Sequence, residues 1–558
     1  MVGYIFKKKS RGKTYYYAGE SERVGKTSRR KWELYLGTFD NIVKKMGEGI
    51  LVPDEVSSTP YGLYSAFAET AGEVDFVEII DKVFPKRDQG LTIGEYFLLG
   101  ILARLTKPIT KSSIQEWYKT QEIEKICPVD AGFLTVQNYW NNMESLNLDN
   151  DVNELHHRLL ERIDKDYVVQ KSYIYFDPSN FHTFIKTHSD NSTIPRQGNS
   201  KKKRFDLRQV NLALAVTKGD AIPIYHKTYP GNVNDVTFFK ENLDSFVKHL
   251  RKNNCTGEIV IVFDKGNNAK EIFDALAGFK DPKVRFIGSI RPSMKEKIFS
   301  TPVDTLEESY VTDSGNIVLY KKMPSLKIYE QTFRGALTYD ENTYQKKLNT
   351  WMENMCMITG EIEVFIASRL NVKKWRDKEA VEKKLKEITS KKKMKKVIHC
   401  KVHGEYGKLY VTTYCDVESA RKMMNTWGKN LIFTSCKDED SVEIITGYRM
   451  KNDIEGCFKI LNNSHLLSVQ PFCHWTDQMI KAHMATCVLG LELIQLIRKK
   501  LRDAGIKISV EKVFASLMEI PLVRLHYLNK KTVYKVGSVS KETKRLTREL
   551  NVKMKLEM

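Results

Sequence analysis

The chain has 558 residues and a formal charge of +21, because 90 Lys and Arg outnumber 69 Asp and Glu. A surplus of this size favours a polyanionic partner held by phosphate neutralisation, although a generally basic protein has the same composition. With 41% hydrophobic residues the chain can build several packed cores, which excludes wholesale disorder. No apolar run reaches the ~18–20 residues that cross a bilayer, so we expect no membrane contact.

Residues 1–60 are predicted to form a small β-rich unit. Residues 13–21 and 31–37 have the composition of strands, and the connection between them carries Arg29 and Arg30 among other cations. A basic hairpin of this kind can bind a phosphate backbone, and it can equally be a solvated turn. We assign both arginines to DNA binding.

Residues 61–170 change to helical periodicity. A buried helix is predicted at 93–105, and the end of another at 155–160. Short helices of this kind suit a DNA-binding bundle and equally suit a plain scaffold, because no recognition-helix signature separates the two. We predict a helical DNA-binding region.

Residues 171–290 contain the first part of a predicted catalytic core. Asp177 ends the strand-like run 173–177, and Asp264 ends a second apolar run, 259–264. Further strands are predicted at 210–216, 222–229 and 284–290. An Asp that ends a strand is often a helix or turn cap, so neither residue is decisive alone. The polar stretch after the first strand carries four adjacent cations that we assign to DNA binding, namely Lys201, Lys202, Lys203 and Arg204.

The order of these elements predicts the fold of the core. Three consecutive strands precede a helix, a strand, a helix and a final strand, which is the order of the ribonuclease-H-like α/β fold. That fold is a mixed five-stranded sheet flanked by helices, in which the first and fourth strands lie side by side. Asp177 and Asp264 are therefore expected to meet at the strand ends, where α/β folds place their sites.

Residues 291–430 interrupt the core. The stretch 371–397 holds twelve Lys and Arg against four acids. Such a run is usually a solvated helix face, and the alternative is a flank of a DNA channel in which Trp375 stacks on the nucleic acid. The pair Cys400 and His403 lacks the second pair that a zinc site needs.

The core is predicted to resume over 431–500, and 501–558 to form a helical unit with a basic tail. Residues 447–459 are expected to form a helix that carries Glu455. At 100° per residue a polar stripe about 80° wide runs along this helix. The stripe consists of Tyr448, Lys451, Glu455, Lys459 and Asn462. It could bind a metal between phosphate contacts, or simply form i,i+4 ion pairs on a solvated face.

Phosphodiester cleavage by two metal ions needs carboxylates that hold the ions roughly 3.5–4 Å apart. Mg²⁺ prefers oxygen ligands and keeps several waters, so three carboxylates suffice. We therefore predict Asp177, Asp264 and Glu455 as the catalytic, metal-binding residues for two Mg²⁺ ions, which Mn²⁺ can replace. The acids between 438 and 443 compete for the third position, but they are expected in a loop. Asp235 is expected to cap a helix.

The spacing Tyr448-x2-Lys451-x3-Glu455-x6-Asn462 resembles the signature Tyr-x2-Arg-x3-Glu-x6-Lys of bacterial insertion-sequence DDE transposases. The resemblance spans roughly residues 170–490. Other short motifs similar to that group occur in the same order, namely Phe181, the loop 198–210, Tyr229-Pro230-Gly231-Asn232, Phe263-Asp264-Lys265-Gly266 and Phe472-Cys473-His474-Trp475.

This resemblance implies a cut-and-paste transposase that binds the inverted repeats of a double-stranded element as a homodimer and cleaves and joins DNA with Mg²⁺. It also implies a mostly β insertion at 291–430 and a location in the bacterial cytoplasm beside the nucleoid. In hairpin-forming relatives the signature Arg and Tyr hold phosphates near a flipped base. Here Lys451 keeps the charge and loses the bidentate fork.

Two alternatives remain open at this stage. A domesticated relative would bind DNA without cutting it, and the changes to Lys451 and Asn462 are compatible with that. A two-metal nuclease that acts on another nucleic acid, RNA included, would need the same three acids.

Overall fold

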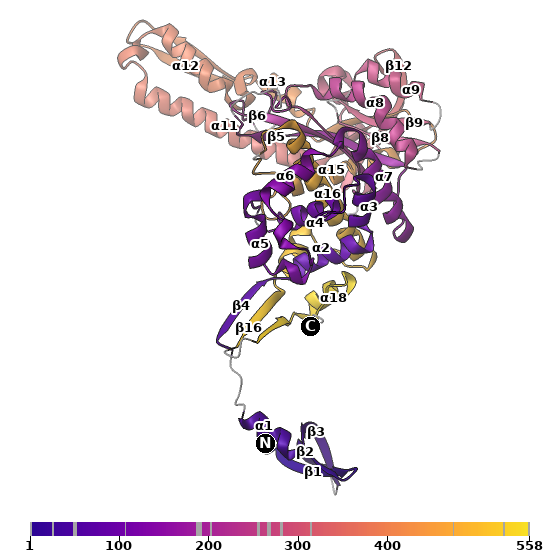
Figure 1. The fold of residues 1–558 in the computed structure, drawn as a ribbon. Helices are drawn as coiled ribbons and strands as arrows, with labels where there is room; N and C mark the ends of the chain where they lie inside the picture. The colour runs from indigo at the N-terminus through magenta and orange to yellow at the C-terminus, as the bar shows by residue number, and fades with distance from the viewer. Residues whose placement is uncertain are drawn as a thin grey trace. The chain divides into compact units, whose positions relative to one another are not determined.

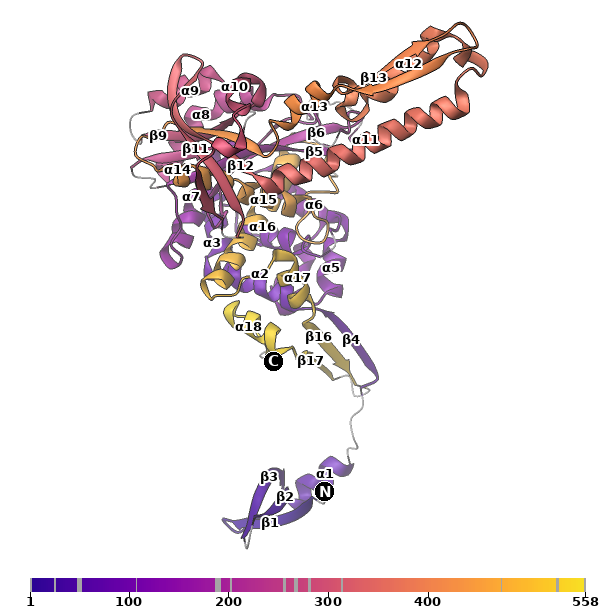
Figure 2. The same ribbon diagram turned by 180° about the vertical axis from the view of Figure 1, so that it is seen from behind.

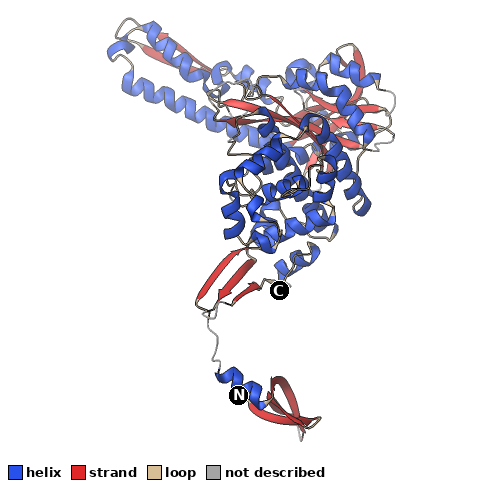
Figure 3. Ribbon diagram, in the orientation of Figure 1, coloured by secondary structure: helices blue, strands red, loops and turns tan. Residues whose placement is uncertain are grey.

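A computed structural model describes residues 3–24, 27–47, 53–106, 108–185, 192–200, 203–253, 257–264, 269–279, 283–312, 315–472, 474–527 and 531–555. The chain divides into two compact units. The first consists of residues 1–65, 515–548 and 552–558, and the second of 66–514 and 549–551. Helices and strands alternate through the second unit (Figure 1, Figure 3), so the mixed α/β class with many helices is confirmed.

The first unit contains two antiparallel sheets of three strands each. One is built from β1 (Tyr4–Ser10), β2 (Lys13–Val24) and β3 (Thr27–Gly37) and is followed by α1 (Phe39–Gly47). The other has the order β17-β16-β4 and is built from β4 (Glu55–Pro60), β16 (Pro521–His526) and β17 (Thr532–Val536). The end of the chain, expected to be helical, thus contributes two strands besides α17 (Val510–Met518) and α18 (Lys541–Glu549).

The second unit is organised around one sheet of nine strands, with the order β10-β11-β12-β15-β9-β8-β5-β6-β7. The strands are β5 (Tyr173–Thr183), β6 (Arg208–Thr217), β7 (Pro223–Pro230), β8 (Ile259–Val262), β9 (Val284–Ile290), β10 (Glu308–Val311), β11 (Ile317–Ile328), β12 (Gln331–Asp340) and β15 (Lys429–Thr434). The pairs β5–β8 and β8–β9 are parallel, and the other pairs are antiparallel. The predicted sheet of five strands is therefore too small. Because β15 pairs with β9, it brings β12, β11 and β10 into the same sheet.

The alternation of side chains along β5 defines the two faces of this sheet. The Phe176 ring lies 4.5 Å from the Phe239 ring of one covering helix. The next side chain back, Tyr175, points to the other face and donates its hydroxyl to the Gly447 carbonyl oxygen at 3.0 Å. The helices on the Phe176 face are α8 (Asp235–Lys252) and α9 (Lys270–Gly278), and those on the Tyr175 face are α7 (Leu148–Asp166), α14 (Ser441–Arg449), α15 (Asn452–Asn462) and α16 (Asp477–Asp503).

Helix α16 is long and apolar because it runs through the interior. An 18-residue window within it has a mean hydropathy of 1.4, and 94% of that window is buried. By length and composition this helix could cross a membrane, so the expectation that no run is long enough was wrong, and burial in the unit accounts for its composition. The helical region comprises α2 (Gly62–Glu73), α3 (Phe76–Val83), α4 (Ile93–Leu102), α5 (Ile114–Thr120) and α6 (Val136–Glu144), and α16 packs against α4 and α6.

The segment between β12 and β15 is mainly helical. It contains α11 (Glu341–Arg369), α12 (Lys378–Ser390), β13 (Ile398–His403), β14 (Tyr410–Cys415) and α13 (Val417–Met424), and residues 341–415 are called the arm below (Figure 2). Over the whole predicted insertion of 291–430, which also includes β10, β11 and β12, more residues lie in helices than in strands, so the expectation of a mostly β insertion is wrong. The apolar residues of α11 recur at alternating intervals of four and three, which is helical periodicity, at Trp351, Met355, Ile358, Ile362 and Phe365.

The charge run of residues 371–397 covers the outside of the arm. Trp375 lies edge-on to Phe365 with ring centroids 5.2 Å apart, and the Lys374 ammonium lies 4.7 Å from the Trp375 ring centre. Trp375 therefore packs on the small apolar core of the arm.

Candidate active site

The two aspartates lie on neighbouring strands. Strand β5 continues past Asp177 because β6 pairs with its whole length, so Asp177 does not end the strand as predicted. The parallel pairing with β8 does stop there, with Tyr175 opposite Val262 as its last pair. Asp177 and Asp264 each lie two residues beyond that pair. The predicted adjacency of the two strands is confirmed.

Both carboxylates face the helices on the Tyr175 side of the sheet. Asp177 has the same parity as Tyr175 along β5, so its side chain leaves on that face. The Phe263 ring contacts Phe286 on the opposite side, with ring centroids 5.7 Å apart. Asp264, the next residue, is thereby turned toward the face that carries Asp177.

The third acid comes from a helix that begins at the site. The single helix expected over 447–459 is wrong, because α14 ends at Arg449 and α15 begins at Asn452, with Lys451 as its N-cap residue. Glu455 lies in the first turn of α15. The predicted polar stripe is thus divided between two helices, and only its second half lies on the helix of Glu455.

The Lys451 ammonium joins the three acids. Its Nζ lies 3.1 Å from Asp264 Oδ1 and 3.5 Å from Glu455 Oε1. The Lys451 side chain is 13% exposed, whereas those of Asp264 and Glu455 are 45% and 47% exposed. Burial alone would lower the pKa of Lys451, but Asp264, Tyr448 and Asp177 raise it above its usual value. One cation therefore forms ion pairs with two of the carboxylates, and the negative charge of the third, Asp177, helps to raise its pKa.

Tyr448 lies beneath this cluster. It is 9% exposed, and its hydroxyl lies 2.6 Å from Ser289 Oγ on β9. Burial raises the pKa of Tyr448 to about 12, so the phenol stays protonated. Ser289 is fully buried in an apolar strand. The sequence signal that could have identified Ser289 as a partner of the site is a small polar residue within an apolar run. The role predicted for Tyr448 in DNA binding stays a prediction.

A second ion pair fixes α14, and sequence reasoning missed it. Arg449 Nη2 donates to Asp340 Oδ2 at 3.0 Å. Asp340 also caps α11 by accepting from the Thr343 amide. The helix that ends at the active site is therefore tied to the base of the arm.

The other predicted DNA-binding residues of the second unit lie on the surface. Lys459 and Lys203 are exposed, and Arg204 is paired with Asp206 at 2.7 Å. Asn462 donates its side-chain amide to the Phe458 carbonyl oxygen at 2.8 Å. Lys201 and Lys202 fall outside the described residues.

The two arginines predicted to bind DNA in the first unit lie on β3 rather than in a turn. Both are exposed, and Arg30 contacts Glu33 and lies 4.2 Å from the Phe6 ring centre. Arg29 lies opposite Glu22 in the register of β2 and β3.

Two weaker candidates have structural roles. Asn234, not Asp235, caps α8, and Asp235 accepts from the Tyr229 hydroxyl at 2.9 Å. Among the acids at 438–443, Asp440 and Glu443 form a capping box at the start of α14.

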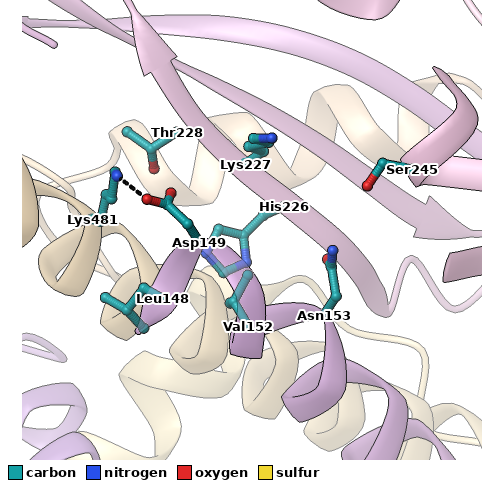
Figure 4. Close-up of a pocket in the computed structure, with 9 residues that line it drawn as sticks. All are labelled: Leu148, Asp149, Val152, Asn153, His226, Lys227, Thr228, Ser245 and Lys481. Carbon is teal, nitrogen blue, oxygen red and sulfur yellow. Dashed lines mark hydrogen bonds and ion pairs between the residues drawn. The ribbon is translucent and has the colours of Figure 1, made fainter. Parts of the chain in front are cut away.

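A cavity of about 40 Å³ lies elsewhere in the second unit, between α7, β7, α8 and α16 (Figure 4). Asp149 and Lys481 form an ion pair at 2.5 Å on its wall. Strand β6 separates β7 from β5, and none of the three candidate acids lines this cavity, which has room for little more than a water molecule.

No protein-family model matches the sequence, and a comparison with curated proteins gives no match either. Among the solved structures that are similar to the chain are two transposases. One is described as the piggyBac transposase synaptic complex with hairpin DNA, at 9% identity over 83% of this chain and 82% of that chain, with a TM-score of 0.37. The other is the Mos1 transposase paired-end complex with the left transposon end, at 13% identity over 30% of this chain and 56% of that chain, with a TM-score of 0.14. At these TM-scores neither likeness establishes a shared fold.

Proposed function

We propose that this protein is a DNA transposase of the DDE type, which binds the terminal inverted repeats of an element and catalyses Mg²⁺-dependent cleavage and strand transfer. The observation that carries the proposal is the pairing of Asp264 and Glu455 with the ammonium of Lys451, whose pKa the charge of Asp177 on the neighbouring strand also raises. Three carboxylates from two parallel strands and a facing helix are the donor set that two-metal phosphodiester chemistry needs.

The strand order β7-β6-β5-β8-β9 within the sheet supports a ribonuclease-H-like core. In that fold the first and fourth strands carry the first two acids, which here are β5 and β8. The insertion between Asp264 and Glu455 would then comprise β10–β12 and the arm.

The donor set suits Mg²⁺, because all three groups are carboxylates and Mg²⁺ prefers oxygen ligands. Within the described ranges, no three His, Cys, Asp or Glu side chains are close enough to hold an ion as they lie. The Lys451 ammonium lies against two of the carboxylates, and it would have to move for an ion to bind both of them. The negative potential of three acids that favours the Lys451 ammonium also favours the binding of metal cations.

Bound metal ions would supply an activated water and stabilise the leaving oxygen of the cleaved phosphodiester. The residues of the chain have separate tasks. Asp177, Asp264 and Glu455 would hold the ions, and Lys451 would donate to phosphate oxygens as a point charge. Tyr448 would hold the end of α14 in position through Ser289.

The remaining features of the proposal concern partners and location. The ligand would be double-stranded DNA at element ends and at the target, bound by a homodimer, and the net charge of +21 supports a polyanionic ligand. Mn²⁺ would replace Mg²⁺, and the protein would act in the bacterial cytoplasm beside the nucleoid.

The test is cleavage and strand transfer on duplexes that carry the candidate element ends, with Mg²⁺ present. The wild type should cleave and join, and Asp264→Ala should abolish both steps while leaving DNA binding intact. Asp438→Ala is the matched control, because Asp438 is exposed on a nearby segment, and it should cleave like the wild type. Retained cleavage by Asp264→Ala would refute the assignment.

A DNA-binding protein without cleavage activity is the second candidate, and the presence of Lys451 and Asn462 where the resembled signature has Arg and Lys favours it. Binding by the wild type without any cleavage at several Mg²⁺ concentrations would select it. Cleavage of RNA alone would instead indicate a nuclease for another substrate.

A further inference from the structure

A pocket of about 240 Å³ lies away from the three acids, among α4, α6 and the segment that precedes α16. Its lining combines cations, hydroxyls and an aromatic ring. The lining residues are Arg104, Ile109, Thr110, Lys111, Ser112, Val136, Trp140, Pro471 and His474. All of them belong to the second unit.

Two cations of this pocket have no carboxylate beside them. Arg104 is 3% exposed, its Nε donates to the Ser468 carbonyl oxygen at 2.9 Å, and its other partners are the Gln470 carbonyl oxygen and the Cys487 thiol. The Lys111 ammonium lies 4.4 Å from the centre of the Tyr139 ring. In the described part of the chain neither cation belongs to an ion pair with Asp or Glu.

The surroundings of the two cations disfavour a second positive charge beside Arg104. Burial, together with the charge of Arg104 and against an opposing effect from Cys487, lowers the pKa of Lys111 to about 7. Burial, with Lys111 and Arg104, lowers the pKa of His474 to about 3, so that ring is a neutral hydrogen-bond partner. His483 behind it is neutral for the same reasons. Arg104 is a buried cation without a carboxylate beside it, and burial disfavours the charged form of Lys111, so a bound anion would stabilise the charge on both side chains.

The backbone leaves space for the ammonium inside the wall. A Cβ at Gly100 would lie 2.5 Å from the Tyr139 hydroxyl oxygen and 3.5 Å from Lys111 Nζ. Only glycine lets the Tyr139 hydroxyl lie this close to α4, whereas 3.5 Å is an ordinary contact for the Lys111 ammonium. The Tyr139 ring against which Lys111 lies is therefore held in place by the packing of α4 and α6.

The mouth of the pocket carries an exposed ring. Trp140 on α6 is 46% exposed, although tryptophan is seldom so accessible without a partner. The hydroxyls of Thr110 and Ser112 lie 2.6 Å apart on the opposite part of the lining. A planar group can stack on the indole while an attached anion reaches the cations, which is how single strands are bound.

We propose that this pocket binds one nucleotide of a DNA strand, with the phosphate on Arg104 and Lys111 and the base on Trp140. The identity of the strand as DNA rests on the proposed function, whereas the pocket itself does not depend on cleavage. A free nucleotide has the same chemistry, a phosphate next to a planar base.

The pocket is connected to the catalytic strand. Gln470, which precedes Pro471 in the wall, donates its side-chain amide to the His182 carbonyl oxygen at 2.6 Å. His182 lies on β5, five residues after Asp177. A strand held in the pocket would thus contact a wall that is hydrogen-bonded to the strand of the first catalytic acid.

The test compares oligonucleotide binding by Lys111→Met and Lys119→Met. Methionine keeps most of the volume and removes the charge, and Lys119 is an exposed lysine on α5 that serves as the matched control. In fluorescence anisotropy, Lys111→Met should bind a single-stranded oligonucleotide about tenfold more weakly and lower the salt slope by about one. Lys119→Met should bind like the wild type.

The melting temperature separates this role from a structural one. Lys111→Met should melt no lower than the wild type, since it removes an ammonium whose charged form is disfavoured by burial and by Arg104. Trp140→Leu, at an exposed position, is a second variant that should also weaken binding. The proposal is overturned if both variants bind like the wild type, or if Lys111→Met loses binding of adenosine monophosphate but not of the oligonucleotide.

The outcomes also distinguish this inference from the proposed function. If Asp264→Ala and the wild type both bind the oligonucleotide through Lys111 but neither cleaves, the pocket stands and the transposase proposal fails. If the wild type cleaves and Lys111→Met binds and cleaves equally well, the pocket inference alone fails.

Discussion

Substituting Lys451 by Met tests whether its ammonium competes with a metal ion for the carboxylates. The variant removes two ion pairs of 3.1 Å and 3.5 Å. Because Asp264 and Glu455 are nearly half exposed, each pair contributes only about 0.2–1 kcal/mol, or about 1 kcal/mol together. At roughly 2.1 cal/mol/K per residue, unfolding a unit of this size converts 1 kcal/mol into a melting shift of only about 1 °C.

The sensitive measurement is therefore Mg²⁺ affinity. An ion that binds the carboxylates of the wild type must displace the ammonium, whereas in Lys451→Met it need not. The dissociation constant for Mg²⁺, measured by calorimetry without DNA, should fall about fivefold for 1 kcal/mol of released competition. Cleavage should also fall, because the phosphate loses its cation.

The control is Lys459→Met, which removes an exposed cation from the same helix. Lys459 forms no ion pair with Asp or Glu in the described ranges, so its loss should leave the Mg²⁺ affinity nearly unchanged. Equal or weaker Mg²⁺ binding by Lys451→Met would refute the competition and the placement of the metal at these acids. An equal gain in Mg²⁺ affinity in both variants would show that the effect comes from the change in net charge and not from competition at the carboxylates.

Three further predictions concern other parts of the second unit. Burial raises the pKa of Glu492, whose carboxyl group faces His156 and, behind it, the buried His226 of β7. The free energy of unfolding should therefore fall as pH rises above 4.5 through the folded pKa. In urea unfolding Glu492→Gln should lose less stability than the wild type between pH 5 and pH 8, and an unchanged slope of stability against pH would contradict this. Gly100→Ala should destabilise by about 1–3 kcal/mol, because its Cβ would lie 2.5 Å from the Tyr139 hydroxyl oxygen, and an unshifted urea midpoint would refute the packing argument. Trp375→Ala should lower the free energy of unfolding by about 2 kcal/mol and increase hydrogen exchange within the arm, since Trp375 packs on the core of the arm. Weaker DNA binding with unchanged exchange would instead favour stacking of Trp375 on a base.

The neighbouring positions of Asp177 and Asp264 could be predicted because the information is local. Each residue follows an apolar β-rich run, and the order of strands and helices between them determines which strands become neighbours. The side-chain alternation of period two then puts both carboxylates on one face. No long-range contact has to be known for this part of the site.

The break before α15 could not be predicted, because no proline or glycine marks it. Residues 448–455 have continuous helical periodicity, and the interruption coincides with tertiary contacts of Tyr448 and Lys451. These contacts involve Ser289 and Asp264, which are more than 150 residues away in the sequence. The local periodicity of the sequence carries no information on such long-range contacts.

The size of the sheet was underestimated for a related reason. Strand β15 could be predicted from its apolar run, but its partner strand could not. The register that pairs Leu431 with Ile290 depends on the free edge of β9, which becomes defined only when the sheet is assembled. The arm was mispredicted differently, because the expectation of β structure came from a resemblance and not from the residues. The four-and-three spacing along α11 favours a helix on local grounds alone.

The choice of lysine at position 451 is consistent with the position of its ammonium. An arginine could hold Asp264 and Glu455 through a bidentate fork, and such a pair is hard to exchange for a metal ion. A lysine ammonium binds as a compact point charge, and it lies 3.1 Å from one carboxylate and 3.5 Å from the other. Without metal it offsets the repulsion among three clustered acids, and with metal it is free to pair with the negative charge that DNA brings. On the proposed function, the residue that departs from the resembled signature therefore retains the electrostatic task while making the exchange between cation and metal easier.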